Sequence, residues 1–115
     1  VLIPIPLSFK RLSERGFNQS LVLSQQLSRE KTHPSSLLRM RNTLAQSSLP
    51  RNERLTNLKG AFVVAPLMAA KLRGQRILLI DDVMTSGASL NTAATVVKQA
   101  GAKSVKGLVF ARTEV

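Results

Sequence analysis

The chain has 115 residues, of which 43% are hydrophobic, so it can bury a core and is not a disordered tail. Its longest apolar runs, such as residues 77–80, are far too short to span a bilayer, and we expect no membrane span. The absence of cysteine excludes disulfides and cysteine-based zinc sites within these residues and is compatible with the cytoplasmic location that we expect. Seventeen Lys and Arg face six Asp and Glu, and the resulting charge of +11 indicates an anionic partner: nucleic acid, a polyphosphate or a phosphorylated metabolite.

Residues 1–7 are apolar but contain Pro4 and Pro6, which predicts a short strand that breaks into a loop. We expect a polar, basic loop over residues 8–17. Asn18 is a good N-cap, and an amphipathic helix is predicted from there to about residue 29, with its apolar positions at Leu21, Val22 and Leu27. The lone His33 precedes Pro34 and is expected to be a loop residue. Because the chain begins inside an apparent strand, we expect it to be the C-terminal fragment of a longer protein.

The second half of the chain shows clearer periodicity. A short strand is possible over residues 35–40, and the polar stretch 42–59 has the character of a functional lid. Residues 61–65 and 66–72 are expected to form a strand and a short helix. A buried strand is predicted at 76–80, a polar loop at 81–88, a helix at 89–100 that ends at Gly101, and a strand at 104–110. Strand, helix and strand in this order predict an α/β fold with a mainly parallel sheet flanked by helices, formed by residues 1–115 as one domain.

Asp81 and Asp82 follow the buried strand, at the sheet edge where such folds bind ligands. Two adjacent carboxylates are costly to hold together unless a partner neutralises them or donates hydrogen bonds. A ribose diol can donate to both, and a hydrated Mg²⁺ would help because it favours a few carboxylates and keeps its water. Taken singly, each aspartate also suits a solvated strand end.

The next residues are small and rich in hydroxyl groups, and they lead into a predicted helix. Thr85, Ser86 and Ser89 can donate hydrogen bonds, and Gly87 lets the backbone curl. Free amide groups and the helix dipole make such a helix start attractive to phosphate. Each residue alone would also suit a plain turn, but the ordered string favours a site for ribose 5-phosphate. It is not a Walker A loop, because no Gly-Lys-Ser/Thr follows, and it is not a Rossmann fingerprint, because Gly87 stands alone.

The string Leu78-Leu79-Ile80-Asp81-Asp82-Val83-Met84-Thr85-Ser86-Gly87-Ala88-Ser89 resembles the binding motif of type I phosphoribosyltransferases. Nearly all of the chain is similar to one branch of them, the ComF/GntX family associated with competence and DNA utilisation. That similarity lies in residues 3–7, 15–19 and 60–62, and at Arg41, Thr43, Gln46, Arg51 and Asn57. Members of this family often carry an N-terminal zinc-ribbon region, and the chain has none of its cysteines.

The resemblance implies a type I phosphoribosyltransferase-like fold that binds phosphoribosyl pyrophosphate and Mg²⁺. It implies that Asp81 and Asp82 hold the ribose hydroxyls, directly or through magnesium, and that the segment from Val83 through Met84, Thr85, Ser86, Gly87 and Ala88 to Ser89 binds the 5-phosphate. Ser8 and Arg15 would approach the pyrophosphate. The segment 41–59 resembles a flexible lid, and Arg41 within it would assist catalysis. No acceptor and no catalytic base stand out, so whether the chain is an active transferase stays open.

The alternative function is a non-catalytic module of DNA uptake that contacts single-stranded DNA or DNA-uptake proteins. Ten of the basic residues lie between Lys10 and Lys59, where only Glu14, Glu30 and Glu53 oppose them. Single-strand sites usually add aromatic platforms for base stacking. Here Phe62 and Phe110 are expected in the core, which leaves Phe9 and Phe17 beside the basic loop.

Overall fold

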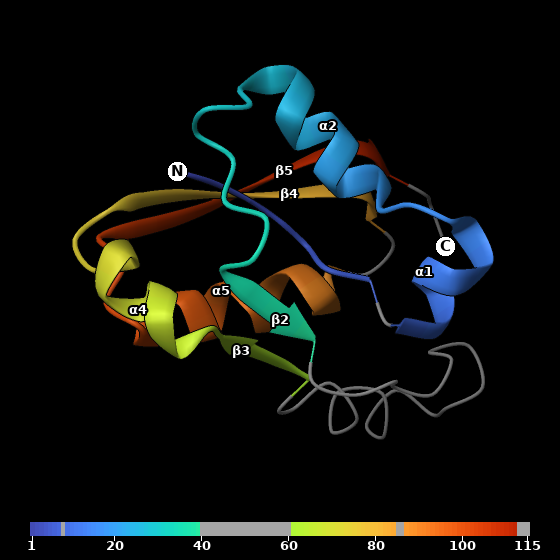
Figure 1. Ribbon diagram of the computed structural model, residues 1–115. Helices are drawn as coiled ribbons and strands as arrows, with labels where there is room; N and C mark the ends of the chain where they lie inside the picture. The colour runs from blue at the N-terminus through green and yellow to red at the C-terminus, as the bar shows by residue number, and fades with distance from the viewer. Residues whose placement is uncertain (8, 40–60, 85–86, 113–115) are drawn as a thin grey trace.

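The residues described by the computed structural model, 1–7, 9–39, 61–84 and 87–112, form a three-stranded parallel sheet between helices (Figure 1). A separate two-stranded antiparallel sheet lies below it in that view. In chain order the elements are β1 (Leu2–Pro4), α1 (Phe9–Arg15), α2 (Gln19–Leu27), β2 (Leu37–Arg39), β3 (Phe62–Val64), α4 (Pro66–Leu72), β4 (Arg76–Met84), α5 (Ala88–Gln99) and β5 (Ser104–Arg112). The expected α/β class with a parallel sheet is confirmed.

β4 is the central strand of the sheet, in the order β1-β4-β5. Ile3 of β1 pairs with Leu79, and Leu79 pairs with Gly107 of β5. Leu79 and Ile80 are fully buried because helices cover both faces of the sheet. This explains why the β4 sequence is a continuous apolar run rather than an alternating one.

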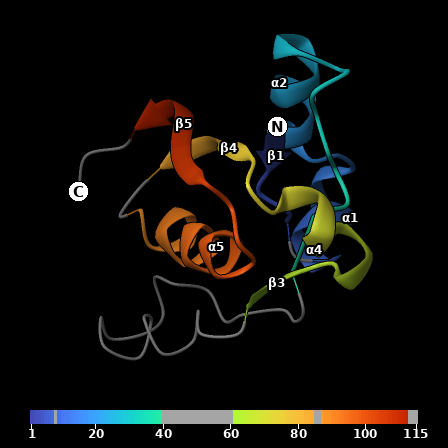
Figure 2. The ribbon, with the colours of Figure 1, turned by 90° about the vertical axis from the view of Figure 1, so that its left-hand side faces the viewer.

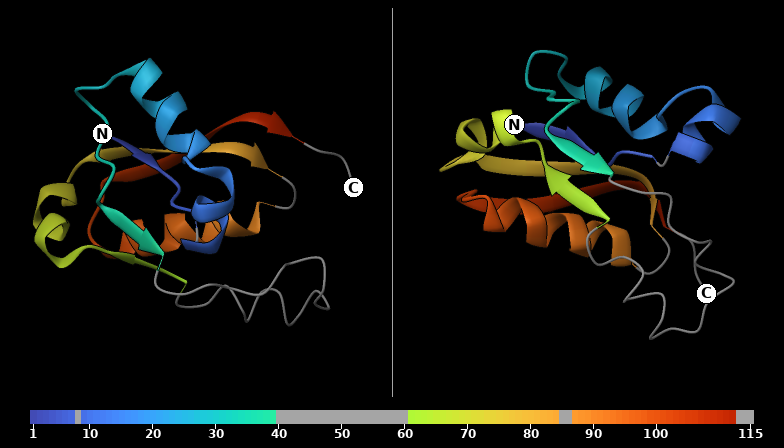
Figure 3. Two further views of the ribbon diagram at one scale, coloured as in Figure 1. Left: turned by 45° about the vertical axis from the view of Figure 1, so that its right-hand side comes forward. Right: turned by 60° about the horizontal axis from the view of Figure 1, so that its bottom comes forward.

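The main core lies on the sheet face covered by α5, α4 and the β2–β3 pair (Figures 1 and 3). Ile3, Leu79, Phe62, Ala93 and Val97 are buried in it. No side chain at Gly107 separates α5 from β5: a Cβ added there would lie 2.6 Å from Cδ2 of Leu90. The glycine therefore lets the helix approach the strand closely, which positions the start of α5 at the carboxyl end of β4.

α2 covers the opposite face, and its most deeply buried residues are polar. Ser20 and Ser24 are its buried residues, and the hydroxyl of Ser24 is 2.8 Å from that of Thr32. The expectation that Leu27 faces the core was wrong, because its side chain is 51% exposed. The other two expected apolar positions, Leu21 and Val22, are half-buried. The fully buried positions carry small hydroxyl side chains with hydrogen-bond partners, which hydrophobic periodicity does not detect.

Three other expectations need correction. The basic segment 8–17 is not a loop throughout, because Phe9–Arg15 is helical; Gly16, at φ 81°, ends the helix, and its amide bonds to Leu12 O at 2.7 Å. The predicted loop at 81–88 begins later, because the pairing of β4 with β5 continues to Met84. Phe110 is 48% exposed rather than buried, since α2 extends over β1 and β4 and leaves that part of β5 uncovered.

β1 has its outer edge occupied by its own chain. The Leu2 amide donates to Lys31 O at 2.8 Å, and the His33 amide donates to Leu2 O at 2.9 Å. Because successive residues of a strand point to opposite edges, Pro4 also faces outward, where its missing N–H costs no ladder bond. None of the helices in the described residues has the length and apolarity needed to cross a membrane.

Candidate functional site

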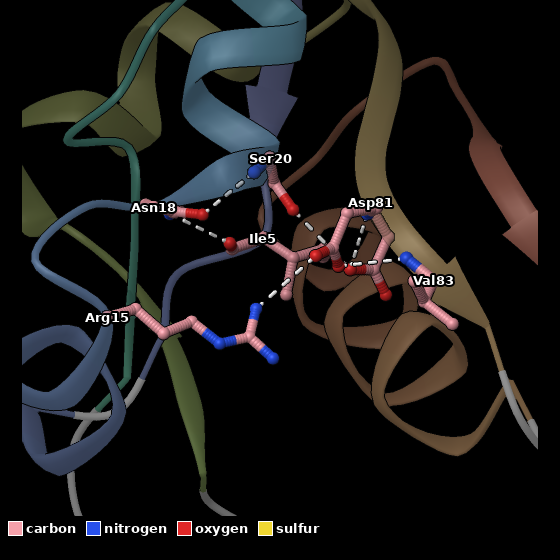
Figure 4. Close-up of polar contacts among 7 residues, drawn as sticks. Ile5, Arg15, Asn18, Ser20, Asp81 and Val83 are labelled. Atoms are coloured by element: carbon pink, nitrogen blue, oxygen red, sulfur yellow. Dashed lines mark hydrogen bonds and ion pairs between the residues drawn. The ribbon is translucent and has the colours of Figure 1, made fainter.

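The candidate site lies where the carboxyl ends of β1 and β4 meet α1 and the start of α2 (Figure 4). The two strands run parallel, so both end at the same edge of the sheet. The Ile5 amide donates to Ile80 O at 2.9 Å and joins the two strand ends. Asn18 then caps α2 by accepting from the Ser20 amide at 3.0 Å, while its own amide group donates to Ile5 O at 3.1 Å. One residue thus fixes the helix start against the strand end.

The adjacent carboxylates accept hydrogen bonds from the backbone that follows each of them. The Asp82 amide donates to Oδ1 of Asp81 at 3.0 Å, and the Val83 amide donates to Oδ1 of Asp82 at 2.8 Å. The Ser20 hydroxyl lies 3.5 Å from the same Asp81 oxygen. The carboxylates are therefore oriented by their surroundings, with oxygen atoms left to accept from a ligand.

The environment of Asp81 favours its protonated form. Burial, followed by the side chain and charge of Asp82, raises the pKa of Asp81 from 3.8 to about 6, against the lowering effect of the Asp82 amide and the Ser20 hydroxyl. A carboxyl group with such a pKa at a sheet edge is a candidate for ligand binding. Hydroxyl donors or a cation at this position would favour the ionised form.

Arg15 reaches the site from the last turn of α1. Its Nη1 is 3.5 Å from Oδ2 of Asp82, with side-chain exposures of 51% and 22%. An ion pair this long and this exposed contributes little to stability. Its consequence is instead to hold a guanidinium group beside the carboxylates, where a ligand phosphate could compete for it.

The expected phosphate cradle is described in part. Gly87, at φ 78°, is the N-cap of α5, and its carbonyl accepts from the Asn91 amide at 2.9 Å. Ala88 and Ser89 begin the helix and are half-buried. This places the first turn of α5 directly after β4. Thr85 and Ser86 lie outside the described residues, as do Ser8, Arg41 and the proposed lid 41–59.

Asp81, Asp82 and Arg15 are brought together at the sheet edge, and Gly87 to Ser89 follow the same strand. Val83 is exposed and continues the strand next to the carboxylates; Met84 ends it. Sequence reasoning did not identify Ser20 as a neighbour of Asp81, nor the bond from Asn18 to Ile5 O. Arg39, at the end of β2, stacks 4.6 Å from the Phe62 ring centroid and donates to Pro6 O at 3.1 Å, which is a structural role.

Asp81 and Asp82 are the side chains at this edge of the sheet that suit a magnesium ion. No group of three or more His, Cys, Asp and Glu gathers among the described residues, so a cation enclosed by protein ligands alone does not fit there. Mg²⁺ usually binds one or two carboxylates and keeps several waters, often together with substrate phosphates. Asp81 and Asp82 meet that requirement, and they would hold the ion directly, through water or through ribose hydroxyls.

Comparison with known proteins identifies the class. Residues 2–114 match the family model for the phosphoribosyl transferase domain, and the chain belongs to this family. It is 35% identical to competence protein F of Haemophilus influenzae over 96% of the chain, and 39% identical to competence protein ComFC of Bacillus subtilis over 98%. It is also 32% identical to the DNA utilization protein YhgH of Escherichia coli K12 over 97%.

These relatives confirm the resemblance to the ComF/GntX branch and the phosphoribosyltransferase fold. The chain covers 49%, 45% and 49% of the three relatives, so it spans about half of their length. No solved structure matches the chain significantly.

Proposed function

We propose that this domain binds phosphoribosyl pyrophosphate together with Mg²⁺ at the carboxyl end of β4. The observation that carries the proposal is the order of features along one strand end: two oriented carboxylates, Asp81 and Asp82, and then the N-terminus of α5. The carboxylates would accept hydrogen bonds from the ribose hydroxyls. The backbone amides and the helix dipole at the start of α5 would bind the 5-phosphate.

The pKa of Asp81 supports this assignment. Burial and a neighbouring carboxylate raise the pKa of this carboxyl group to about 6. Hydroxyl donors or a cation beside it would lower that pKa again. Arg15 forms a weak ion pair with Asp82. It would exchange this carboxylate partner for a pyrophosphate oxygen. Bound magnesium would supply neutralising charge to the pyrophosphate.

We further propose that the domain transfers the phosphoribosyl group to an acceptor nucleophile. Pyrophosphate would leave the anomeric carbon, and the sugar would become cation-like as it departs. Arg15, with Arg41 and Ser8 from the parts of the chain that are not described, would bind the departing charge and so stabilise the transition state. The proposal includes the cytoplasmic location expected from the sequence.

Calorimetric titration with phosphoribosyl pyrophosphate, with and without Mg²⁺, tests the binding site. We expect magnesium-dependent heat for the wild type and its loss in Asp81→Asn/Asp82→Asn. Glu30→Gln is a matched control, because it removes an exposed carboxylate from the turn after α2. Binding that survives the double substitution would refute the assignment of these carboxylates.

A second function is favoured by the charge of +11 and by relatives named for competence and DNA utilisation. In this alternative the domain is a non-catalytic module that contacts single-stranded DNA during DNA uptake and use. Binding of a labelled oligonucleotide that weakens with added salt would support it, whereas absent or salt-insensitive binding would count against it.

A further inference from the structure

A cluster of cations lies at the end of the molecule opposite the candidate site. We call it the amino-edge cluster, because it surrounds the amino ends of β4 and β5, where α4 and α5 also end; Figure 2 shows this end facing the viewer. Its members are all exposed, and they are Lys71, Arg73, Arg76, Lys98, Lys103 and Lys106. None of them comes from the basic stretch between Lys10 and Lys59.

Backbone hydrogen bonds bring these cations together from distant parts of the chain. The Gly74 amide donates to Gly101 O at 2.8 Å, and the Lys103 amide donates to Gln75 O at 2.8 Å. Arg76 pairs with Ser104 in the sheet. The turns before β4 and before β5 are thus joined, and their basic side chains share one surface.

The chain segments that carry the cluster, residues 71–76 and 98–106, contain no acidic residue. The sequence contains no acidic residue between Glu53 and Asp81, and none between Asp82 and Glu114. Among the described residues, the ion pair between Arg15 and Asp82 lies at the other end of β4. Like charges gathered without acids repel one another and create a positive potential, which attracts anions.

Local structure accounts for only part of the cluster. Lys71 and Lys98 lie in the last turns of α4 and α5, where cations complement the helix dipole, and Lys98 Nζ also donates to Lys103 O at 2.9 Å. The stem of Arg73 packs near Gly101, with its Cγ 3.4 Å from a Cβ added there. Arg76 and Lys106 lie on strands, where neither of these roles applies.

The chemistry of the surface selects nucleic acid among polyanions. Glycine and polar residues separate the cations, at Gly74, Gln75, Gln99 and Gly101. The exposed apolar side chains nearest to them in sequence, Leu67 and Leu108, lie on two different elements and do not form the apolar helix face that interfacial membrane binding uses. No phenylalanine of the described residues belongs to the cluster, so it offers no platform for base stacking. Exposed cations without neighbouring aromatic rings suit contacts with phosphate oxygens. Such contacts do not distinguish one base sequence from another.

We propose that the amino-edge cluster binds the phosphodiester backbone of DNA without stacking the bases, at a surface separate from the carboxylate site. This inference rests on the DNA-contacting function proposed above and does not depend on phosphoribosyl pyrophosphate. Because the two sites lie at opposite ends of β4, both ligands bind at once and neither displaces the other.

Fluorescence anisotropy of a short labelled oligonucleotide at several salt concentrations tests the proposal. Arg76→Gln/Lys103→Gln removes two cations of the cluster, and Arg54→Gln/Lys59→Gln removes two from the rival basic stretch. Each phosphate contact contributes about 0.7 to 0.9 to the slope of log K against log salt, so we expect the first variant to lose about 1.4 to 1.8 of slope and the control to lose none. The loss should appear with both kinds of DNA, at about 1.4 for single-stranded and about 1.8 for duplex DNA.

Equal losses in the two double variants, or a loss confined to single-stranded DNA, would overturn the proposal. If Arg76→Gln/Lys103→Gln does not fold, Lys106→Gln replaces it, with an expected slope loss of about 0.8. Titration with phosphoribosyl pyrophosphate separates the two proposals: the cluster variant should keep its heat of binding, and Asp81→Asn/Asp82→Asn should keep its DNA affinity. Competition between DNA and phosphoribosyl pyrophosphate would contradict separate surfaces.

Discussion

Ser20, in the first turn of α2, directs its hydroxyl group at Oδ1 of Asp81 on β4, and the two oxygens are 3.5 Å apart (Figure 4). The residues are 61 positions apart in the chain. This contact connects the helix on one face of the sheet to the strand end that carries the carboxylates. The placement of α2 therefore influences the acidity of Asp81.

Replacing Ser20 by alanine should raise the pKa of Asp81 above its value of about 6, because a hydrogen bond to the ionised form is lost. The loss of one partly buried hydrogen bond should also cost about 1 kcal/mol of stability. Carboxyl-carbon NMR titration measures the first effect and urea unfolding the second. Ser24→Ala removes a buried hydroxyl that contacts Thr32 instead, so it should lower stability and leave the pKa of Asp81 in place.

The stability of the ligand-free protein should fall as pH rises between 3.8 and about 6. The raised pKa of Asp81 means that the folded protein binds this proton more tightly than the unfolded chain, so the stabilisation is complete below 3.8 and is lost as pH passes about 6. Urea unfolding across this range measures the decline. The Asp81→Asn variant should lack the part of the decline in unfolding free energy that Asp81 causes. An identical pH profile in the variant would contradict a raised pKa for Asp81.

Arg15→Ala should separate binding from stability. Its ion pair with Asp82 is long and exposed, so the free energy of unfolding should change by less than about 0.5 kcal/mol. If Arg15 binds pyrophosphate, the affinity for phosphoribosyl pyrophosphate should fall by roughly tenfold, the loss typical of one charge-assisted hydrogen bond. Arg29→Ala, in the exposed turn after α2, is the matched control. Equal affinity in both variants would remove Arg15 from the site.

Gly107→Ala should destabilise the domain by about 1 kcal/mol, because the added methyl group would lie 2.6 Å from Cδ2 of Leu90. The cost is modest because the end of a leucine side chain can move. Thermal unfolding measures it, and Leu90→Ala provides the partner for a double-mutant cycle. In the Leu90→Ala background the Gly107→Ala substitution should cost little, whereas additive losses would show that another contact is responsible.

Much of the parallel core could be predicted from sequence, because a fully buried strand such as β4 is a continuous apolar run and Gly101 marks the end of α5. α1 was missed because its sequence is mostly polar and charged and too short to show a hydrophobic period. Leu27 of α2 was wrongly placed in the core because the fully buried positions of this helix carry hydroxyl groups, at Ser20 and Ser24, rather than apolar side chains.

The candidate site likewise contains residues that the sequence could identify and residues that it could not. Asp81, Asp82 and Gly87 are close in sequence, so their order along a strand and the following helix could be recognised directly. The contacts from Ser20 and Arg15 depend on how β1 aligns with β4, which brings together segments more than 60 residues apart. No local pattern encodes that alignment, so these neighbours could not be identified before the fold was known.

The two outer strands of the sheet, β1 and β5, differ in whether their outward backbone groups already have hydrogen-bond partners in the described residues. Along β1 the outward groups of Leu2 are already bonded to residues 31 and 33, and Pro4 has no N–H to offer. β5 is the opposite edge of the same sheet, and Leu108 and Phe110 on it are partly exposed. Among the described residues no strand pairs with the outer edge of β5, so a further strand, from a longer chain or from a second molecule, would extend the sheet at β5 rather than at β1.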